Sequence, residues 1–252
     1  MGMLTILEKY QDEKGNTVDY AGRVEKGVRI VFVGSNNRLV VNDGAKITDL
    51  SIRFDCDNAH IEIGACSIKG SMLVGQDCRI VVGDGVTSSG KVFITAAEGT
   101  EVTIGEDCMF SADITVRTHD SHPIFDVSTG KRVNVAKSSR IGRHVWIGAD
   151  VAILGGSSIG DGSVIGMRSV VKGKFPNNVV IVGMPAKTVK RNIAWERPHL
   201  TGKPPFYKPD ASTVKKSAYW NMTREEPVII QQRRNVLGLA KSALRRLWMR
   251  PA

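Results

Sequence analysis

Long hydrophobic runs are missing from this sequence, and aromatic residues are scarce. No stretch of about 18 or more apolar residues occurs, so no transmembrane helix is expected. Residues 1–15 carry polar residues throughout their length and lack the apolar core of a signal peptide, which predicts a cytoplasmic protein. Phe, Trp and Tyr make up 6% of the chain, whereas 26 of its 252 residues are glycine. This balance favours a turn-rich, all-β fold.

Cysteine is also sparse, and the four cysteines show no CxxC spacing. We therefore expect reduced, buried side chains and no zinc site or other metal site. The net charge of +10 is uneven, because residues 227–252 carry basic side chains and no acidic one. This basic excess is partly a property of the tail, so no nucleic-acid partner is predicted.

A six-residue repeat runs through the second half of the chain. A period of six fits neither an α-helix nor a plain strand. It fits a chain in which each short strand is followed by a turn. Three such strands close one coil, and successive coils stack about 4.8 Å apart. One aliphatic residue per strand then points inward, and a small residue fills each corner. The aliphatic positions are Ile141, Ile147, Ile153, Ile159, Ile165 and Val171, and the small or β-branched positions are Val145, Val151, Ser157, Ser163 and Ser169.

The repeat predicts where the domains begin and end. It extends less regularly upstream, so a parallel β-helix is expected from Val31 to Val182. Residues 1–30 then form an N-terminal cap, and residues 31–190 form the β-helical domain. The repeat stops between Val116 and Ile141, which predicts a loop at about 117–140, and loops on a rigid scaffold often carry function.

The C-terminal extension, residues 191–252, has a different composition. Its first part is rich in proline and aromatic residues, which predicts an irregular strap. Residues 232–249 have an apolar face surrounded by basic side chains, which predicts a short amphipathic α-helix. Two interpretations stay open for this helix. It either packs on the β-helix or on a neighbouring subunit, or it lies on the anionic inner face of a membrane.

Four motifs accompany the repeat. They are Asp120-Ser121-His122-Pro123, Val145-Trp146-Ile147-Gly148, Ile165-Gly166-Met167-Arg168-Ser169-Val170-Val171 and Gly183-Met184-Pro185-Ala186-Lys187. Together with the repeat they resemble the hexapeptide-repeat acetyltransferases, and are most similar to sugar and polysaccharide O-acetyltransferases such as the galactoside and maltose enzymes. The resemblance covers about residues 104–190. It implies a left-handed helix, although right-handed crossovers are the general rule. It also implies a homotrimer with a catalytic β-helical domain, acetyl-CoA as the donor and a polysaccharide, lipopolysaccharide or oligosaccharide as the acceptor.

The resemblance assigns the catalytic base to His122, which directly precedes Pro123 in the loop. An acceptor hydroxyl needs a base to take its proton, and histidine suits that task at neutral pH. His119 competes for this role and is otherwise expected to bind the acceptor. Asp120 is expected to orient an imidazole, to bind a sugar hydroxyl or to serve only the turn. Trp146 is expected beside the catalytic pocket.

The coenzyme is expected to lie along stacked turns that carry small residues. Gly148 and Ala149 occupy one such turn, and Gly166 and Met167 occupy the matching turn, where Met167 departs from the usual small residue. The phosphates of the coenzyme need cations, which Lys172, Lys187 and Lys190 are expected to supply.

Two alternatives to O-acetylation stay open. The first is N-acetylation of an amino sugar. The second is a γ-type carbonic anhydrase on the same helix, for which His119, His122 and His144 are the candidate zinc ligands. The acceptor sugar cannot be read from the sequence.

Overall fold

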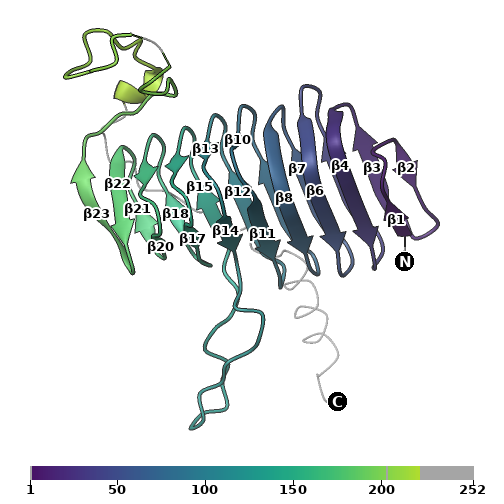
Figure 1. Ribbon diagram of the computed structural model, residues 1–252. Coiled ribbons are helices and arrows are strands. Elements are labelled where there is room, and N and C mark those ends of the chain that lie inside the picture. Colours follow the sequence, from purple (N-terminus) through teal and green to yellow (C-terminus); the bar gives the residue numbers. More distant parts are fainter. Residues whose placement is uncertain (1, 203, 222–252) are drawn as a thin grey trace, which may run out of the picture.

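A computed structural model describes residues 2–202 and 204–221, and it shows a solenoid of stacked coils built from short β-strands (Figure 1). Each coil places strands on three faces, and equivalent strands of successive coils pair in parallel. This parallel stacking confirms the predicted β-helix. Within the two described stretches, no helix is long and apolar enough to cross a membrane.

Two of the three faces are joined into one sheet of 14 strands by long strands that bend around a corner. These strands are β4 (Arg23–Phe32), β6 (Lys46–Phe54) and β8 (Ser67–Val74). Both β10 and β11 pair with β8, so two shorter strands replace each long one from that coil onward. The first face continues with β10 (Thr87–Ser88), β13 (Met109–Phe110), β16 (Trp146–Ile147), β19 (Val164–Ile165) and β22 (Val179–Gly183), and the second with β11 (Val92–Ala96), β14 (Ile114–Arg117), β17 (Ala152–Ile153) and β20 (Val170–Val171).

The third face is a separate sheet of nine strands. Its strands from β3 onward pair in parallel, one strand from each coil. They are β2 (Tyr10–Gln11), β3 (Thr17–Tyr20), β5 (Arg38–Val41), β7 (His60–Ile63), β9 (Arg79–Val82), β12 (Glu101–Ile104), β15 (Ser139–Ile141), β18 (Ser158–Ile159) and β21 (Lys174–Phe175).

The core lies inside the coils and is built from the repeat. All the aliphatic repeat positions from Ile141 to Val171 are at most 1% exposed, and the small corner positions are equally buried. The corner serines satisfy their hydroxyls locally: Ser157 donates to the Leu154 carbonyl at 2.6 Å, and Ser169 donates to the Gly166 carbonyl at 2.7 Å. Buried hydroxyls therefore carry no unpaired donor at these corners.

The stacked coils begin earlier than the sequence predicts. β3 already pairs in parallel with β5, and β4 pairs with β6, so the expected cap boundary at residue 30 falls inside β4. Polar residues stand among the buried residues of these coils and interrupt the hydrophobic pattern. Asn16 and Asn37 are fully buried, and their side chains hydrogen-bond each other at 3.0 Å. Antiparallel strands close both ends of the solenoid. β1 (Gly2–Leu4) lies on β4, and β23 (Ala186–Arg191) lies on β22.

Residues 192–221 form the irregular strap, whose helical content in the described stretches is the 3-10 turn η1 (Ala218–Asn221). The strap docks along the corner between the third and first faces. The Asn178 side chain donates to the carbonyls of Ile193 and Tyr219, both at 2.8 Å. The predicted basic helix at residues 232–249 lies outside the described residues.

Candidate active site

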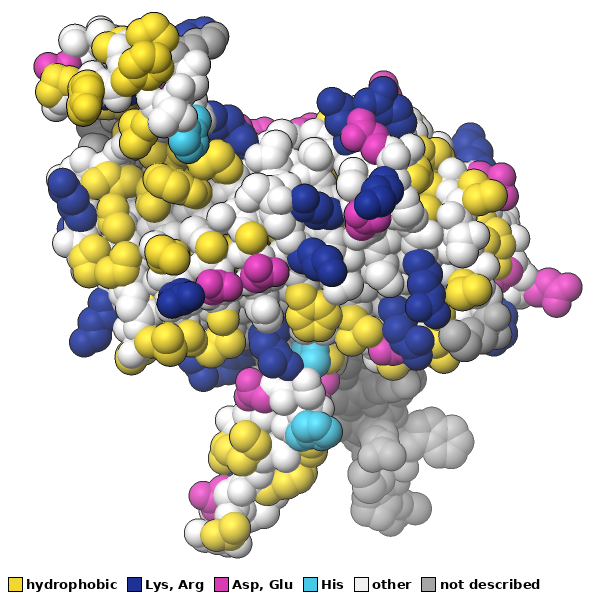
Figure 2. All heavy atoms as spheres, viewed as in Figure 1, with side chains coloured by type: hydrophobic (Ala, Val, Ile, Leu, Met, Phe, Trp, Pro, Cys, Tyr) yellow, Lys and Arg dark blue, Asp and Glu magenta, His cyan; other side chains and the backbone are white. Residues whose placement is uncertain are grey.

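The longest loop leaves the solenoid at the end of β14, at Arg117, and returns at Ser139 (Figure 1). It projects away from the coils, in the segment where the repeat stops. Exposed apolar side chains gather on it, as Figure 2 shows. Such a cluster on a projecting segment is typical of a surface that contacts a partner. The side chains that are more than half exposed are Ile124, Phe125, Val127, Val133 and Val135.

Three polar residues hold the root of the loop in place. One oxygen of the Glu98 carboxylate pairs with Arg132, and the other accepts the Ala136 amide at 3.1 Å. The hydrogen bond from Arg132 has the largest effect on the pKa of Glu98. Together with the bond from the Ala136 amide, it holds this pKa below its usual range. Nδ2 of Asn134 donates to the carbonyl of His122 at 2.8 Å. The backbone that carries His122 is therefore fixed from the returning side of the loop.

The His119 ring is engaged on both sides. Its Nδ1 accepts the Ser121 amide at 3.0 Å, and its Nε2 lies 2.9 Å from Oγ1 of Thr95 on β11. Since an accepting Nδ1 carries no proton, Nε2 is the protonated nitrogen and donates to Thr95. Partial burial, helped by the Arg117 cation, lowers the pKa of His119 and favours this neutral form. His119 therefore has no lone pair left to accept a proton from an acceptor.

The His122 ring is exposed and makes no hydrogen bond with any residue in the described part of the chain. Its main chain is held, because its amide donates to the Asp120 carbonyl at 2.9 Å. The Asp120 carboxylate accepts Nδ2 of Asn134 at 3.2 Å, so it braces the loop, and it makes no hydrogen bond with either imidazole in the described part of the chain. Of the two loop histidines, His122 is the one whose ring presents a lone pair to solvent.

Trp146 lies on β16 in the first face, and its side chain is 40% exposed. Its aromatic neighbour is Trp195 of the strap, with ring centroids 6.0 Å apart. Among the described residues, no hydrogen bond or ring contact joins Trp146 to the loop, which leaves from the second face. Trp146 and the loop that carries His122 therefore belong to different faces of one chain.

His144, the third histidine of the zinc alternative, is a structural residue. Its Nδ1 lies 2.6 Å from Oδ2 of Asp107, and its Nε2 lies 3.0 Å from the Trp195 carbonyl. The ring stacks on Trp195 and Tyr219, with centroids 4.0 and 4.3 Å apart, and it is 2% exposed. Arg197 of the strap donates to the other Asp107 oxygen at 2.6 Å. Both ring nitrogens are occupied, so His144 is not available to a metal.

The turns predicted to bind the coenzyme stack on each other at the corner between the first and second faces. The Ala149 carbonyl accepts the Arg168 amide at 2.8 Å, which joins the turn after β16 to the turn after β19. The amides of Ala149 and Met167 make no hydrogen bond with described residues. Two main-chain donors at one corner are therefore left for a ligand.

The two glycines of these turns have a packing role of their own. A Cβ atom at Gly148 would lie 2.7 Å from the Met167 nitrogen, and one at Gly166 would lie 2.5 Å from Cγ1 of Val182. Both positions therefore need glycine for coil stacking, whether or not a coenzyme binds.

The predicted phosphate-binding lysines gather at the C-terminal end of the solenoid. Lys172 follows β20, whereas Lys187 and Lys190 lie on the edge strand β23, and all three are exposed. β23 pairs with β22 and also contacts β20, so these lysines lie on neighbouring elements.

These coils match known proteins. A family profile described as bacterial transferase hexapeptide (six repeats) matches residues 138–173, which include Trp146 and the two stacked turns. The polysialic acid O-acetyltransferase of Neisseria meningitidis is 36% identical over 173 residues, which cover 67% of this chain and 80% of that protein. The chain belongs to the hexapeptide-repeat acetyltransferase family.

Two further relatives of this hexapeptide-repeat acetyltransferase bear the same substrate in their names. The polysialic acid O-acetyltransferase of Escherichia coli O1:K1 / APEC is 39% identical over 130 residues, 52% of this chain, and the chain spans 42% of that protein's length. The crystal structure of the polySia-specific acetyltransferase NeuO superposes with a TM-score of 0.69 at 35% identity, covering 73% of this chain and 79% of NeuO. The fold is the left-handed β-helix that the family resemblance implies.

Sequence reasoning about this acetyltransferase missed the residues that hold its loop. Thr95 is a buried polar residue on β11, and Glu98 and Asn134 lie in non-repetitive segments. None of the three belongs to a motif, so their roles follow only from their contacts.

Proposed function

We propose that the chain transfers an acetyl group from acetyl-CoA to a sugar hydroxyl of a polysaccharide or oligosaccharide, with His122 as general base. The observation that carries the proposal is the free His122 ring on a backbone fixed by Asn134. Membership of the acetyltransferase family supports acetyl transfer. The polysialic acid in the names of its relatives supports a polysaccharide acceptor.

In this mechanism the unprotonated nitrogen of His122 takes the proton of the acceptor hydroxyl as its oxygen attacks the thioester carbonyl. The new C–O bond forms and the C–S bond breaks. The thiolate of coenzyme A then takes up the proton from the imidazolium, so the histidine returns to its neutral form. His119, with both nitrogens engaged, holds the loop during this exchange.

The donor site in this proposal is the corner of stacked turns. The free amides of Ala149 and Met167 are donors for the carbonyls of a pantetheine arm. Lys172, Lys187 and Lys190 neutralise the phosphates at the C-terminal end of the groove. Trp146 lines the acetyl or acceptor pocket.

The active site is completed between subunits of a closed C3 homotrimer. Trp146 and the loop that carries His122 belong to different faces of one chain, and the projecting loop exposes apolar side chains that a neighbouring subunit covers. N-acetylation of an amino sugar uses the same base and remains the second candidate. The carbonic anhydrase alternative is disfavoured, because His119 and His144 both have their ring nitrogens engaged.

An acetyl-transfer screen tests the proposal. The protein is incubated with acetyl-CoA and polysialic acid, lipopolysaccharide, capsule oligosaccharides or amino sugars, and the products are read by mass and by their stability to mild base. Base-labile esters on a hydroxyl acceptor are the expected result. Base-stable amides alone would assign N-acetylation, and no product with any acceptor would refute acetyl transfer to sugars.

A further inference from the structure

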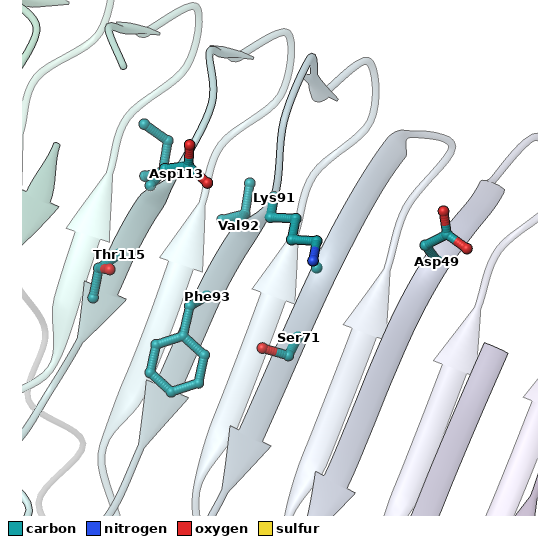
Figure 3. A pocket seen from close by; sticks show the side chains of 9 residues that line it. Asp49, Ser71, Lys91, Val92, Phe93, Asp113 and Thr115 are labelled. Atoms are coloured by element: carbon teal, nitrogen blue, oxygen red, sulfur yellow. The ribbon is translucent and has the colours of Figure 1, made fainter. Parts of the chain in front are cut away.

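An open hollow of about 650 Å³ lies on the second face, and none of the residues that the sequence assigns to catalysis lines it (Figure 3). Its wall includes the side chain of Phe93, with Ser71 and Thr115 on either side. Lys91 and Asp113 lie at its upper margin. The hollow thus combines one aromatic ring with several polar groups.

Phe93 forms an aromatic platform in this hollow. It lies on β11, its side chain is 39% exposed, and it is paired in register with Ser71 on β8 and with Thr115 on β14. Adjacent strands are about 4.8 Å apart, so a hydroxyl residue lies close to the ring on each side. An exposed aromatic ring between two hydroxyls matches a ligand with one apolar face and a polar rim.

The polar groups around the ring are not used by the fold. The Lys91 ammonium, the Asp113 carboxylate and the hydroxyls of Ser71 and Thr115 make no hydrogen bond or ion pair with any residue in the two described stretches. Asp49, at the far margin, pairs with Lys26 at 3.4 Å. The hollow therefore offers a ligand a cationic hydrogen-bond donor, an anionic acceptor and two hydroxyls.

We propose that this hollow is a binding subsite for a pyranose ring of the acceptor glycan, separate from the sugar that is acetylated. The C–H face of the sugar stacks on Phe93, and its hydroxyls donate to Asp113 and accept from Lys91. The ligand class is an extended glycan chain. The inference rests on the proposed function only in naming this glycan as the acceptor.

The hollow is aligned with the catalytic loop. Phe93 and Thr95 lie on the same side of β11, two residues and about 6.5 Å apart. Thr95 holds His119, whose loop carries His122. A glycan that lies along β11 therefore reaches from the hollow to the loop, and binding in the hollow places a neighbouring sugar near the base.

Affinity electrophoresis of the full chain without acetyl-CoA tests the subsite. Native gels contain either polysialic acid or dextran. The two gels therefore show whether the hollow binds the sugar ring of an acidic or of a neutral glycan. We expect the wild type to be retarded in at least one gel. Phe93→Ala raises the dissociation constant there about five- to tenfold, and Phe93→Trp restores retardation. Tyr207→Ala removes an aromatic ring that is 90% exposed on the strap and serves as the matched control.

The outcomes separate this inference from the proposed function. His122→Ala should bind the glycan as the wild type does while losing transfer, so a failed base assignment leaves the binding result intact. Equal retardation of Phe93→Ala and wild type, or no retardation of the wild type in either gel, would overturn the subsite. A smaller native mass for Phe93→Ala would identify the hollow as a subunit contact and also overturn it.

Discussion

The hydroxyl of Thr95 lies 2.9 Å from Nε2 of His119, and this contact ties the projecting loop to a strand of the solenoid. The other nitrogen of the same ring accepts the Ser121 amide, so His119 is fixed from both sides. His122, three positions on, has a held backbone and a free ring. The two loop histidines thus differ in their contacts, because the ring of His119 is hydrogen-bonded on both sides and the ring of His122 is exposed.

Replacement of His122 tests its proposed role directly. His122→Ala should lower kcat about 10²- to 10⁴-fold, because the acceptor hydroxyl loses its base. Coenzyme binding, measured by calorimetry, should stay near the wild-type value. His119→Ala is the matched variant and should cost less. Near wild-type turnover in His122→Ala, together with a large loss in His119→Ala, would reverse the two roles.

Acid should loosen the loop through His119. The pKa of His119 is lowered in the folded protein, so the unfolded chain binds the proton more readily. Neutral His119 therefore contributes fully to the free energy of unfolding above the pKa of about 6.5 that it has in the unfolded chain. This contribution is lost as the pH falls through the lower pKa of the folded protein. Protonated Nδ1 can no longer accept the Ser121 amide. Limited proteolysis within the loop should accelerate as the pH falls below about 6.5, and His119→Gln should remove most of that pH dependence.

Asn134 should act on turnover through the backbone of His122. Asn134→Ala removes the 2.8 Å hydrogen bond to the His122 carbonyl. The loss of one such bond corresponds to a decrease of about three- to tenfold in kcat, with KM little changed. Thr129→Ala, at the exposed tip of the loop, is the control and should leave kcat unaltered. An increase in KM without a change in kcat would instead place Asn134 in acceptor binding.

The oligomeric state is measurable without any substrate. Multi-angle light scattering should give three times the chain mass of 27.4 kDa. Phe125→Glu combined with Val133→Glu places charge on the apolar loop surface and should shift the population toward monomers, with loss of activity. A monomer mass for the wild type would contradict the shared active site.

The repeat made most of the fold predictable, because each aliphatic at a spacing of six lands inside a coil and each small residue lands at a corner. The first coils were missed, because the long strand β4 buries Val28, Ile30 and Phe32 at a spacing of two, and no spacing of six appears there. The candidate base was recognisable from the family motif. The contacts of Glu98 and Asn134 and the place of Phe93 in the hollow were not predictable, since they depend on which coils lie side by side and no local spacing encodes that.

The strap changes how such a stack can come apart. Coils that contact only their neighbours can fray one at a time from an end. Arg197 donates to the carbonyl of Gly85, 112 positions earlier, and the strap also contacts Asp107, His144 and Asn178 on the way. The terminal coils are thereby joined to coils deep in the stack. Fraying from the C-terminal end has to release the strap first, so these coils are expected to unfold as one cooperative unit.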